Sequence, residues 1–174
     1  IYKANGGTPS ALNLGLSVAT GKYICWLSAD DALIEDKVSK QVGLMESDQG
    51  LGFSYTSFVV IDANGTKQYD VNSAYYPDKQ EMVTKLREGC FINGSSVMMN
   101  SSALKIVGNF DENLPQAHDY DLWFRFLRHY SCGFQAEPLL AYRWHGENMS
   151  QNPNEACSVI VQERAKQLFP EWLT

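Results

Sequence analysis

Residues 21–31 read GKYICWLSADD, an apolar run followed closely by two aspartates. The run at residues 23–27 is continuous and lies between a glycine and a polar turn, which predicts a strand buried on both faces. In open α/β sheets, ligands bind beyond the carboxyl ends of the strands. We therefore expect Asp30 and Asp31 to stand at a binding site.

Helical and strand patterns alternate along the rest of the chain. An Asn64-Gly65 pair predicts a hairpin, and residues 74–89 are polar and carry no predicted element. The order predicts a single α/β domain over residues 1–174. We expect helices at residues 10–20, 36–45, 101–107, 119–130 and 155–169, and strands at residues 23–27, 51–61, 67–71, 94–99 and 134–144.

The net charge and the apolar content of the chain argue against some classes of function. The net charge of the 174 residues is −6, which gives nucleic-acid binding no electrostatic support. A negative protein that handles phosphates needs a cation or backbone donors. No apolar stretch is long enough to span a bilayer and no signal peptide is visible. The chain begins at Ile1 with helix-like sequence almost at once, so we expect that the front of a domain is missing.

The cysteines are far apart and lie outside CxxC pairs, which favours reduced thiols in a cytoplasmic protein over a zinc site or disulfides. They are Cys25, Cys90, Cys132 and Cys157.

Two adjacent carboxylates after a strand are typical of a site for a divalent cation. Asp30 and Asp31 repel each other unless something offsets their charge, and Mg²⁺ or Mn²⁺ held by carboxylates and substrate phosphates would do so. Taken alone, the pair equally fits a solvated acidic turn before a helix.

A second acidic cluster opens the predicted helix at 119–130. It reads His118-Asp119-Tyr120-Asp121-Leu122-Trp123, and a carboxylate there could act as a general base held by a rigid element. The alternative is that Asp119 and Asp121 only complement the helix dipole.

A third cluster lies at the end of the last predicted strand. Arg143 and His145 alternate along it and so point the same way, where they could contact a phosphate or a metal ion. A lone histidine at such a place is more often structural.

Together with the first helix, these clusters resemble the family 2 glycosyltransferases, which have the GT-A fold. The resemblance covers residues 4–150. Its motifs stand here as NGGTPSALNLG at residues 5–15, ATGKYICWLSADD at 19–31, GNFDENL at 108–114, HDYDLWFR at 118–125, and the residues Arg143, His145, Asn148 and Ser150.

The resemblance implies a three-layer α/β sandwich around a mostly parallel sheet, truncated at the N-terminus by the first strand, helix and strand. Residues 1–60 would form the rest of the donor- and metal-binding half, and residues 90–150 the half with the acceptor and the catalytic base. A sheet without its first strands would expose apolar edges and favour homo-oligomers.

For the donor half, the resemblance implies Asp30 as the metal ligand, supported by Asp31, with Mn²⁺ or Mg²⁺ as the cofactor. His145 would help to bind the metal or the diphosphate. The nucleotide-sugar donor would be contacted by Asn13, Ser28, Asp30, Asp31 and Arg143.

For the acceptor half, the resemblance implies Asp119 as the base that takes the proton of an acceptor hydroxyl, with inversion at the anomeric carbon. His118, Asp121 and Trp123 would shape the acceptor side. The acceptor would be a carbohydrate or a lipid-linked sugar in polysaccharide or glycan biosynthesis, with the parent protein in the cytoplasm, including the inner face of the membrane as a peripheral location.

Three positions depart from the family pattern: Ser28 replaces an aspartate, Leu12 an arginine and His118 a glutamate. These departures leave two alternatives open. The chain could be an inactive binding or scaffold module of the same fold. It could also be a nucleotidyltransferase of related fold, although no basic glycine-rich loop is visible.

Overall fold

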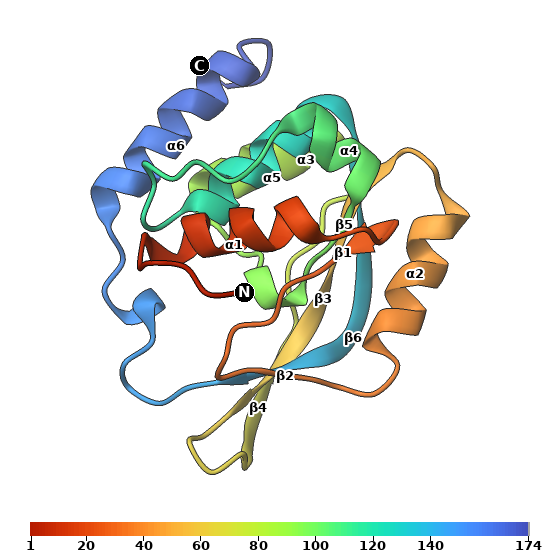
Figure 1. The fold of residues 1–174 in the computed structure, drawn as a ribbon. Helices are drawn as coiled ribbons and strands as arrows, with labels where there is room; N and C mark the ends of the chain where they lie inside the picture. The colour runs from red at the N-terminus through yellow and green to blue at the C-terminus, as the bar shows by residue number, and fades with distance from the viewer. Residues whose placement is uncertain (174) are drawn as a thin grey trace.

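The computed structural model describes residues 1–173, which form a mixed α/β domain (Figure 1). The helices are α1 Gly7–Val18, α2 Lys37–Ser47, α3 Lys79–Glu88, α4 Ser101–Val107, α5 His118–His129 and α6 Glu155–Leu168. The strands are β1 Tyr23–Ile24, β2 Ala32–Leu33, β3 Leu51–Ile61, β4 Lys67–Val71, β5 Met98–Asn100 and β6 Ser131–Arg143. Two short 3₁₀ turns are η1 Gly94–Ser96 and η2 Met149–Gln151.

The sheet is built around β3 and β6. Its order is β1-β5-β3-β6-β2, and β4 pairs with β3 off this path. The long β3–β6 pair is parallel, and the shorter pairings with β1, β2, β4 and β5 are antiparallel. The parallel character that we predicted therefore belongs to the central pair, where β3 is buried along almost its whole length.

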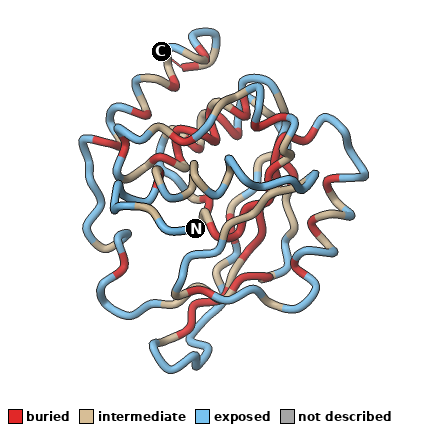
Figure 2. Tube along the Cα trace, viewed as in Figure 1, coloured by how far each residue is buried: buried red, intermediate tan, exposed pale blue. Residues whose placement is uncertain are grey.

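Helices cover both faces of this sheet. Helix α2 lies on one face, and α3, α4 and α5 lie on the other, with α6 packed outside α5 (Figure 1). The main core forms between β3 and α5, where Phe53 lies 5.1 Å from Trp123 and 5.4 Å from Phe126, ring centroid to ring centroid. Buried residues follow β3 and α5, whereas β4 is largely exposed (Figure 2). No helix within residues 1–173 combines the length and the apolar character needed to cross a bilayer.

The strand predicted at residues 23–27 is much shorter than expected. Only Tyr23 and Ile24 pair with β5, and Leu27 is 43% exposed. The chain leaves the sheet after Ile24, and the Trp26 ring packs on Phe110 and Trp123 from the loop. Ile24 and Trp26 are partly buried against the core, so the prediction of a strand buried on both faces was wrong.

The strand predicted at residues 94–99 begins instead with the turn η1. The Asn93 side chain accepts a hydrogen bond from the Ser95 N–H, which stabilises a 3₁₀ turn before β5. Asn-Gly at this place is a turn signal.

Helix α3 lies in the polar stretch for which no element was predicted. Asp78 caps it by accepting from the Glu81 N–H, and Met82, Val83 and Leu86 bury its inner face. The other helices, the hairpin and the strands at 51–61 and 134–144 agree with the predictions within a few residues.

Stability should decline at alkaline pH because of Cys132. Burial raises the pKa of this thiol from its ordinary value of 9.0 to about 12. Between those values the unfolded chain has lost a proton that the folded chain keeps, so the free energy of unfolding falls as the pH rises. We expect this group to remove about 1–2 kcal/mol between pH 8 and pH 10.5, measured by urea unfolding. Cys132→Ala should show a shallower decline than the wild type, and equal declines would contradict the assignment.

Candidate active site

Asp30 and His145 meet although they lie far apart in the sequence. The Asp30 Oδ2 atom is 3.0 Å from His145 Nε2, and both side chains remain about one-third exposed. Asp30 follows the loop after β1, and His145 follows the end of β6. The sequence prediction that these two residues share one site is therefore consistent with their contact, while metal binding itself stays a prediction.

Arg143 holds the loop that carries Asp30. Its Nε donates to the Asp30 carbonyl at 2.8 Å, and its Nη1 donates to the carbonyls of Asp62 at 2.9 Å and Ala63 at 3.1 Å. The guanidinium therefore ties the loop to the β3–β4 hairpin. Because these nitrogens already have acceptors, the predicted donor contact of Arg143 has only Nη2 left to make it.

Asn148 shapes the segment that carries His145. Its Nδ2 donates to the Arg143 carbonyl at 2.7 Å, and its Oδ1 accepts from the His145 N–H at 3.0 Å. Gly146 lies between them with φ of 84°, a left-handed conformation that costs glycine little. The amide thus closes a tight turn that presents the imidazole to Asp30.

Asp31 is buried beneath this pair. Its Oδ1 accepts from the Arg143 N–H at 3.0 Å. Burial raises the pKa of the Asp31 carboxyl, while hydrogen bonds with Ser95 and the Arg143 N–H act to lower it. Asp31 is only 9% exposed, so it supports the loop rather than offering an open ligand.

Ser28 connects the same loop to the turn η1. Its hydroxyl lies 2.9 Å from the Ser95 hydroxyl, and its N–H donates to that oxygen at 3.2 Å. The predicted donor contact of Ser28 remains a prediction, since its side chain is exposed but already has a partner.

Asp119 lies on the other side of η1. A Cβ added to Gly94 would stand 3.2 Å from Asp119 Oδ2 and 2.6 Å from Trp26 Cζ2, so only glycine fits between them. Asp119 Oδ1 accepts from the Tyr120 N–H at 2.9 Å. Since Ser95 contacts Ser28, one short turn touches both acidic motifs, which brings their loops into one region.

His118 precedes Asp119 and is almost buried. It is 8% exposed and packs edge-to-face on Phe110, with ring centroids 5.6 Å apart. Its Nδ1 has no hydrogen-bond partner among residues 1–173. A buried nitrogen without a partner is costly, and the predicted acceptor contact of His118 stays a prediction.

Trp123 requires a correction, because it is 0% exposed. Its ring is stacked between Trp26 at 5.9 Å and Phe53 at 5.1 Å. A ring enclosed in this way cannot stack on an acceptor sugar, and its role is to support Trp26 from behind.

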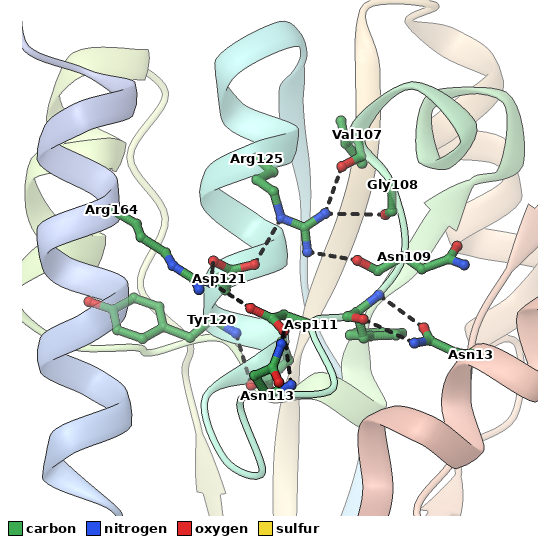
Figure 3. A network of polar contacts seen from close by, with 12 residues as sticks. Asn13, Val107, Gly108, Asn109, Asp111, Asn113, Tyr120, Asp121, Arg125 and Arg164 are labelled. Atoms are coloured by element: carbon green, nitrogen blue, oxygen red, sulfur yellow. Dashed lines mark hydrogen bonds and ion pairs between the residues drawn. The ribbon is translucent and has the colours of Figure 1, made fainter.

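Asp121 also has a different role from the predicted acceptor contact. Its carboxylate is 6% exposed and accepts from Arg125 Nε at 2.8 Å and from Arg164 Nη1 at 3.0 Å (Figure 3). Arg125 also donates to the carbonyls of Val107 and Asn109. The network joins α5 to α6 and to the loop after α4, beside a cavity of about 360 Å³ that shares no lining residue with the Asp30 loop.

Asn13 uses its side-chain amide within the protein. Its Oδ1 accepts from the Phe110 N–H at 3.0 Å, and its Nδ2 donates to the Phe110 carbonyl at 3.0 Å and to Glu112 at 2.9 Å (Figure 3). The amide therefore fastens α1 to the loop before α5. Both of its polar atoms are engaged within the protein, and the predicted donor contact of Asn13 stays a prediction.

Sequence reasoning missed the residues between the two motifs. Gly94 and Ser95 lie in a segment that was predicted as a strand, and Trp26 in one predicted as fully buried. The Asn93-Gly94 pair was the available signal, because it indicates a turn where the backbone approaches another group closely.

The residues present fit a divalent cation that also has substrate ligands. Within residues 1–173 no group of three or more His, Cys, Asp or Glu side chains gathers as a metal cluster. Two ligands at about 2.1 Å on neighbouring corners of an octahedron lie about 3 Å apart. The 3.0 Å between Asp30 Oδ2 and His145 Nε2 is a hydrogen-bond distance that is also compatible with that spacing, and phosphates and water would have to complete the shell.

Comparisons with known proteins show the family of the chain. A family model described as glycosyltransferase-like family 2 matches residues 3–159. An uncharacterized glycosyltransferase of Rickettsia typhi is 34% identical over 171 residues, which cover 94% of this chain and 52% of that protein. The amylovoran biosynthesis glycosyltransferase AmsB of Erwinia amylovora is 31% identical over 163 residues, which cover 88% of this chain and 52% of that protein. The chain thus spans about half the length of these relatives.

The fold is similar to that of TarS from S. aureus. The crystal structure of its residues 1–349 in complex with UDP-GlcNAc superposes with a TM-score of 0.66 at 11% identity, covering 99% of this chain and 54% of that chain. At this identity the likeness shows the fold alone, and it confirms the predicted GT-A fold. With a family model that matches most of the chain, the chain belongs to the glycosyltransferase-like family 2.

Proposed function

We propose that this chain carries the transfer site of a metal-dependent, inverting glycosyltransferase that moves a sugar from a nucleotide-diphosphate donor to an acceptor hydroxyl. One observation carries the proposal. The turn η1 lies against Asp119 at Gly94 and against the loop of Asp30 at Ser95, so the proposed metal ligand Asp30 and the proposed base Asp119 border the same turn. Membership of the family supports the reaction class.

Asp30 and His145 would hold Mn²⁺ or Mg²⁺ together with the diphosphate of the donor. A bound cation supplies charge neutralisation for the departing nucleoside diphosphate. The protein's own part is to fix the two ligands. Arg143 and Asn148 do this through the hydrogen bonds that hold the Asp30 loop and the His145 turn.

Asp119 would take the proton from the acceptor hydroxyl while that oxygen attacks the anomeric carbon. The bond from the anomeric carbon to the diphosphate breaks in the same step, and the nucleoside diphosphate leaves with the bonding electrons. Attack opposite the leaving group inverts the configuration without a covalent intermediate. The position of Asp119 on the first turn of a helix packed in the core gives the base a rigid support.

The acceptor is proposed to be a carbohydrate or lipid-linked sugar in polysaccharide biosynthesis. The similarity to AmsB, which is named for amylovoran biosynthesis, supports the proposal of a role in polysaccharide biosynthesis. The TarS complex with UDP-GlcNAc supports the proposal of a nucleotide-sugar donor. We place the reaction in the cytoplasm, including peripheral sites at the membrane.

Nucleotide binding should depend on a divalent cation and on Asp30. We expect calorimetric titration with UDP, GDP and dTDP to show binding of one of them in the presence of Mn²⁺ and none after chelation. Asp30→Asn should weaken that binding by about 100-fold or more, because it removes a charged ligand. Asp70→Asn on the exposed hairpin is the matched control and should bind like the wild type. Binding that is indifferent to Mn²⁺ and to Asp30 would contradict the proposal.

A further inference from the structure

A lysine and a glutamine lie inside the domain under the sheet. Lys37 is 1% exposed and Gln41 is 0% exposed, and the Lys37 ammonium donates to Gln41 Oε1 at 2.6 Å. Burial lowers the pKa of Lys37 to about 8. Burying an amine and an amide costs free energy of folding unless both groups are hydrogen-bonded. Here these hydrogen bonds also hold other parts of the fold in place.

The other end of the Gln41 amide reaches the turn η1. Its Nε2 lies 3.1 Å from the Ser96 carbonyl, 3.1 Å from Ser54 Oγ and 3.3 Å from the Ser54 carbonyl. Ser54 belongs to β3, the central strand of the sheet. Gln41 therefore fastens the last residue of η1 to both α2 and the most rigid part of the fold.

The turn that Gln41 holds is the one between the two acidic motifs. Ser95, the residue before Ser96, contacts Ser28, and Gly94 separates Trp26 from Asp119. A shift of η1 would move the Asp119 surroundings relative to the loop of Asp30. The hydrogen bonds of Arg143 and Asn148, which hold the metal-binding pair, do not involve η1.

We propose that Gln41 is a positioning residue: its side-chain amide, oriented by Lys37, fixes the turn η1 and thereby sets the placement of Asp119 relative to the Asp30 loop. The effect on catalysis rests on the proposed function, whereas the effect on the turn does not. Because a misplacement of about 1 Å costs on the order of 100-fold in rate, a loosened turn should reduce turnover. Nucleotide affinity should change much less, since the hydrogen bonds of Arg143 and Asn148 to the Asp30 loop and the His145 turn remain, and only the contact of Ser28 with Ser95 is loosened.

Two variants separate the halves of the network. Gln41→Met has a similar volume and removes both sets of hydrogen bonds. Gln41→Glu keeps an acceptor for Lys37 but removes the donor to the Ser96 carbonyl. Gln49→Met is the matched control, because Gln49 is exposed just beyond the C-terminal end of α2 and its amide bonds to the nearby Glu46.

Trp26 reports on the turn without any need for activity. The chain has four tryptophans, and 5-fluorotryptophan labelling gives one ¹⁹F signal for each, assigned by Trp26→Phe. We expect the Trp26 signal to shift or broaden in both Gln41 variants, while that of Trp172, stacked on Phe169, stays in place. Gly94→Ala, which forces the Trp26 ring aside, is the positive control.

In the full-length protein we expect both Gln41 variants to lower kcat by about 10- to 100-fold. Their affinity for the nucleotide should change by less than about threefold, a split that general unfolding would not produce. Gln49→Met should match the wild type in both measurements. An unmoved Trp26 signal in folded Gln41 variants would overturn the proposal, as would equal losses of kcat and nucleotide affinity. If the wild type transfers no sugar, the proposed function fails, and the Trp26 signal still decides the role of Gln41.

Discussion

Asp119→Asn should lower the transfer rate of the full-length protein by about 10³-fold while leaving the fold intact. A positioned general base contributes about 10²- to 10⁴-fold, and asparagine has nearly the same shape but cannot take a proton. The amide oxygen can still accept the Tyr120 N–H that Asp119 Oδ1 accepts now, so the start of α5 should survive. The measurement is kcat for sugar transfer, with nucleotide affinity and thermal unfolding recorded on the same samples.

The control for this substitution is Glu112→Gln. Glu112 is an exposed acid that accepts from Asn13 and belongs to the loop before α5. It should transfer sugar at nearly the wild-type rate. An Asp119→Asn variant that also kept its rate would remove Asp119 from the role of base, and with it the proposed mechanism.

Asp121→Ala should have the opposite phenotype, a large loss of stability. The carboxylate is 6% exposed and holds Arg125 and Arg164, so its removal leaves Arg125 without a carboxylate partner and Arg164 with Asp111 alone (Figure 3). Breaking a fully buried pair costs about 3–5 kcal/mol, and because the two arginine side chains are 21% and 41% exposed we expect about 2–3 kcal/mol. For a domain of this size the loss corresponds to a fall in Tm of about 5–10 °C.

Asp111→Ala is the comparison for that loss. Asp111 also accepts from Arg164, at 2.8 Å, but its side chain is 21% exposed, so the loss of free energy of unfolding should be less than half as large. Urea unfolding at pH 7 measures both. If Asp121→Ala unfolded like the wild type, the network in Figure 3 would contribute little, and a direct role of Asp121 at the acceptor would return to consideration.

Much of the fold was predictable because its signals are local. The Asn64-Gly65 hairpin, the cap of α4 by Asn100 and the long apolar strand β3 depend on neighbours within a few residues. The strand at residues 23–27 and the helix α3 were not, because their outcome depends on partners elsewhere. Residues after Ile24 have no strand to pair with, and α3 exists because Leu86 and its neighbours reach the core.

The candidate site divides in the same way. The motifs pointed to Asp30, His145 and Asp119, and the structure brings the first two into contact. Asn13 and Trp123 stand in equally recognisable motifs, yet their side chains serve the interior. A sequence motif identifies residues that are typical of a family. It does not distinguish residues that stabilise the fold from residues that take part in the reaction.

The sequence by itself determined the family, the order of most elements and the set of acidic and basic residues from which a transfer site can be built. Only the tertiary structure decided which of them face the site. Asp119 and Asp121 are two residues apart, about 200° around α5, so one lies against Gly94 and the other against Arg125 and Arg164. The groups that each of these two carboxylates contacts come from α6, η1 and the loop after α4. These elements are distant from α5 in the sequence or separated from it by a loop, and they lie next to it in space.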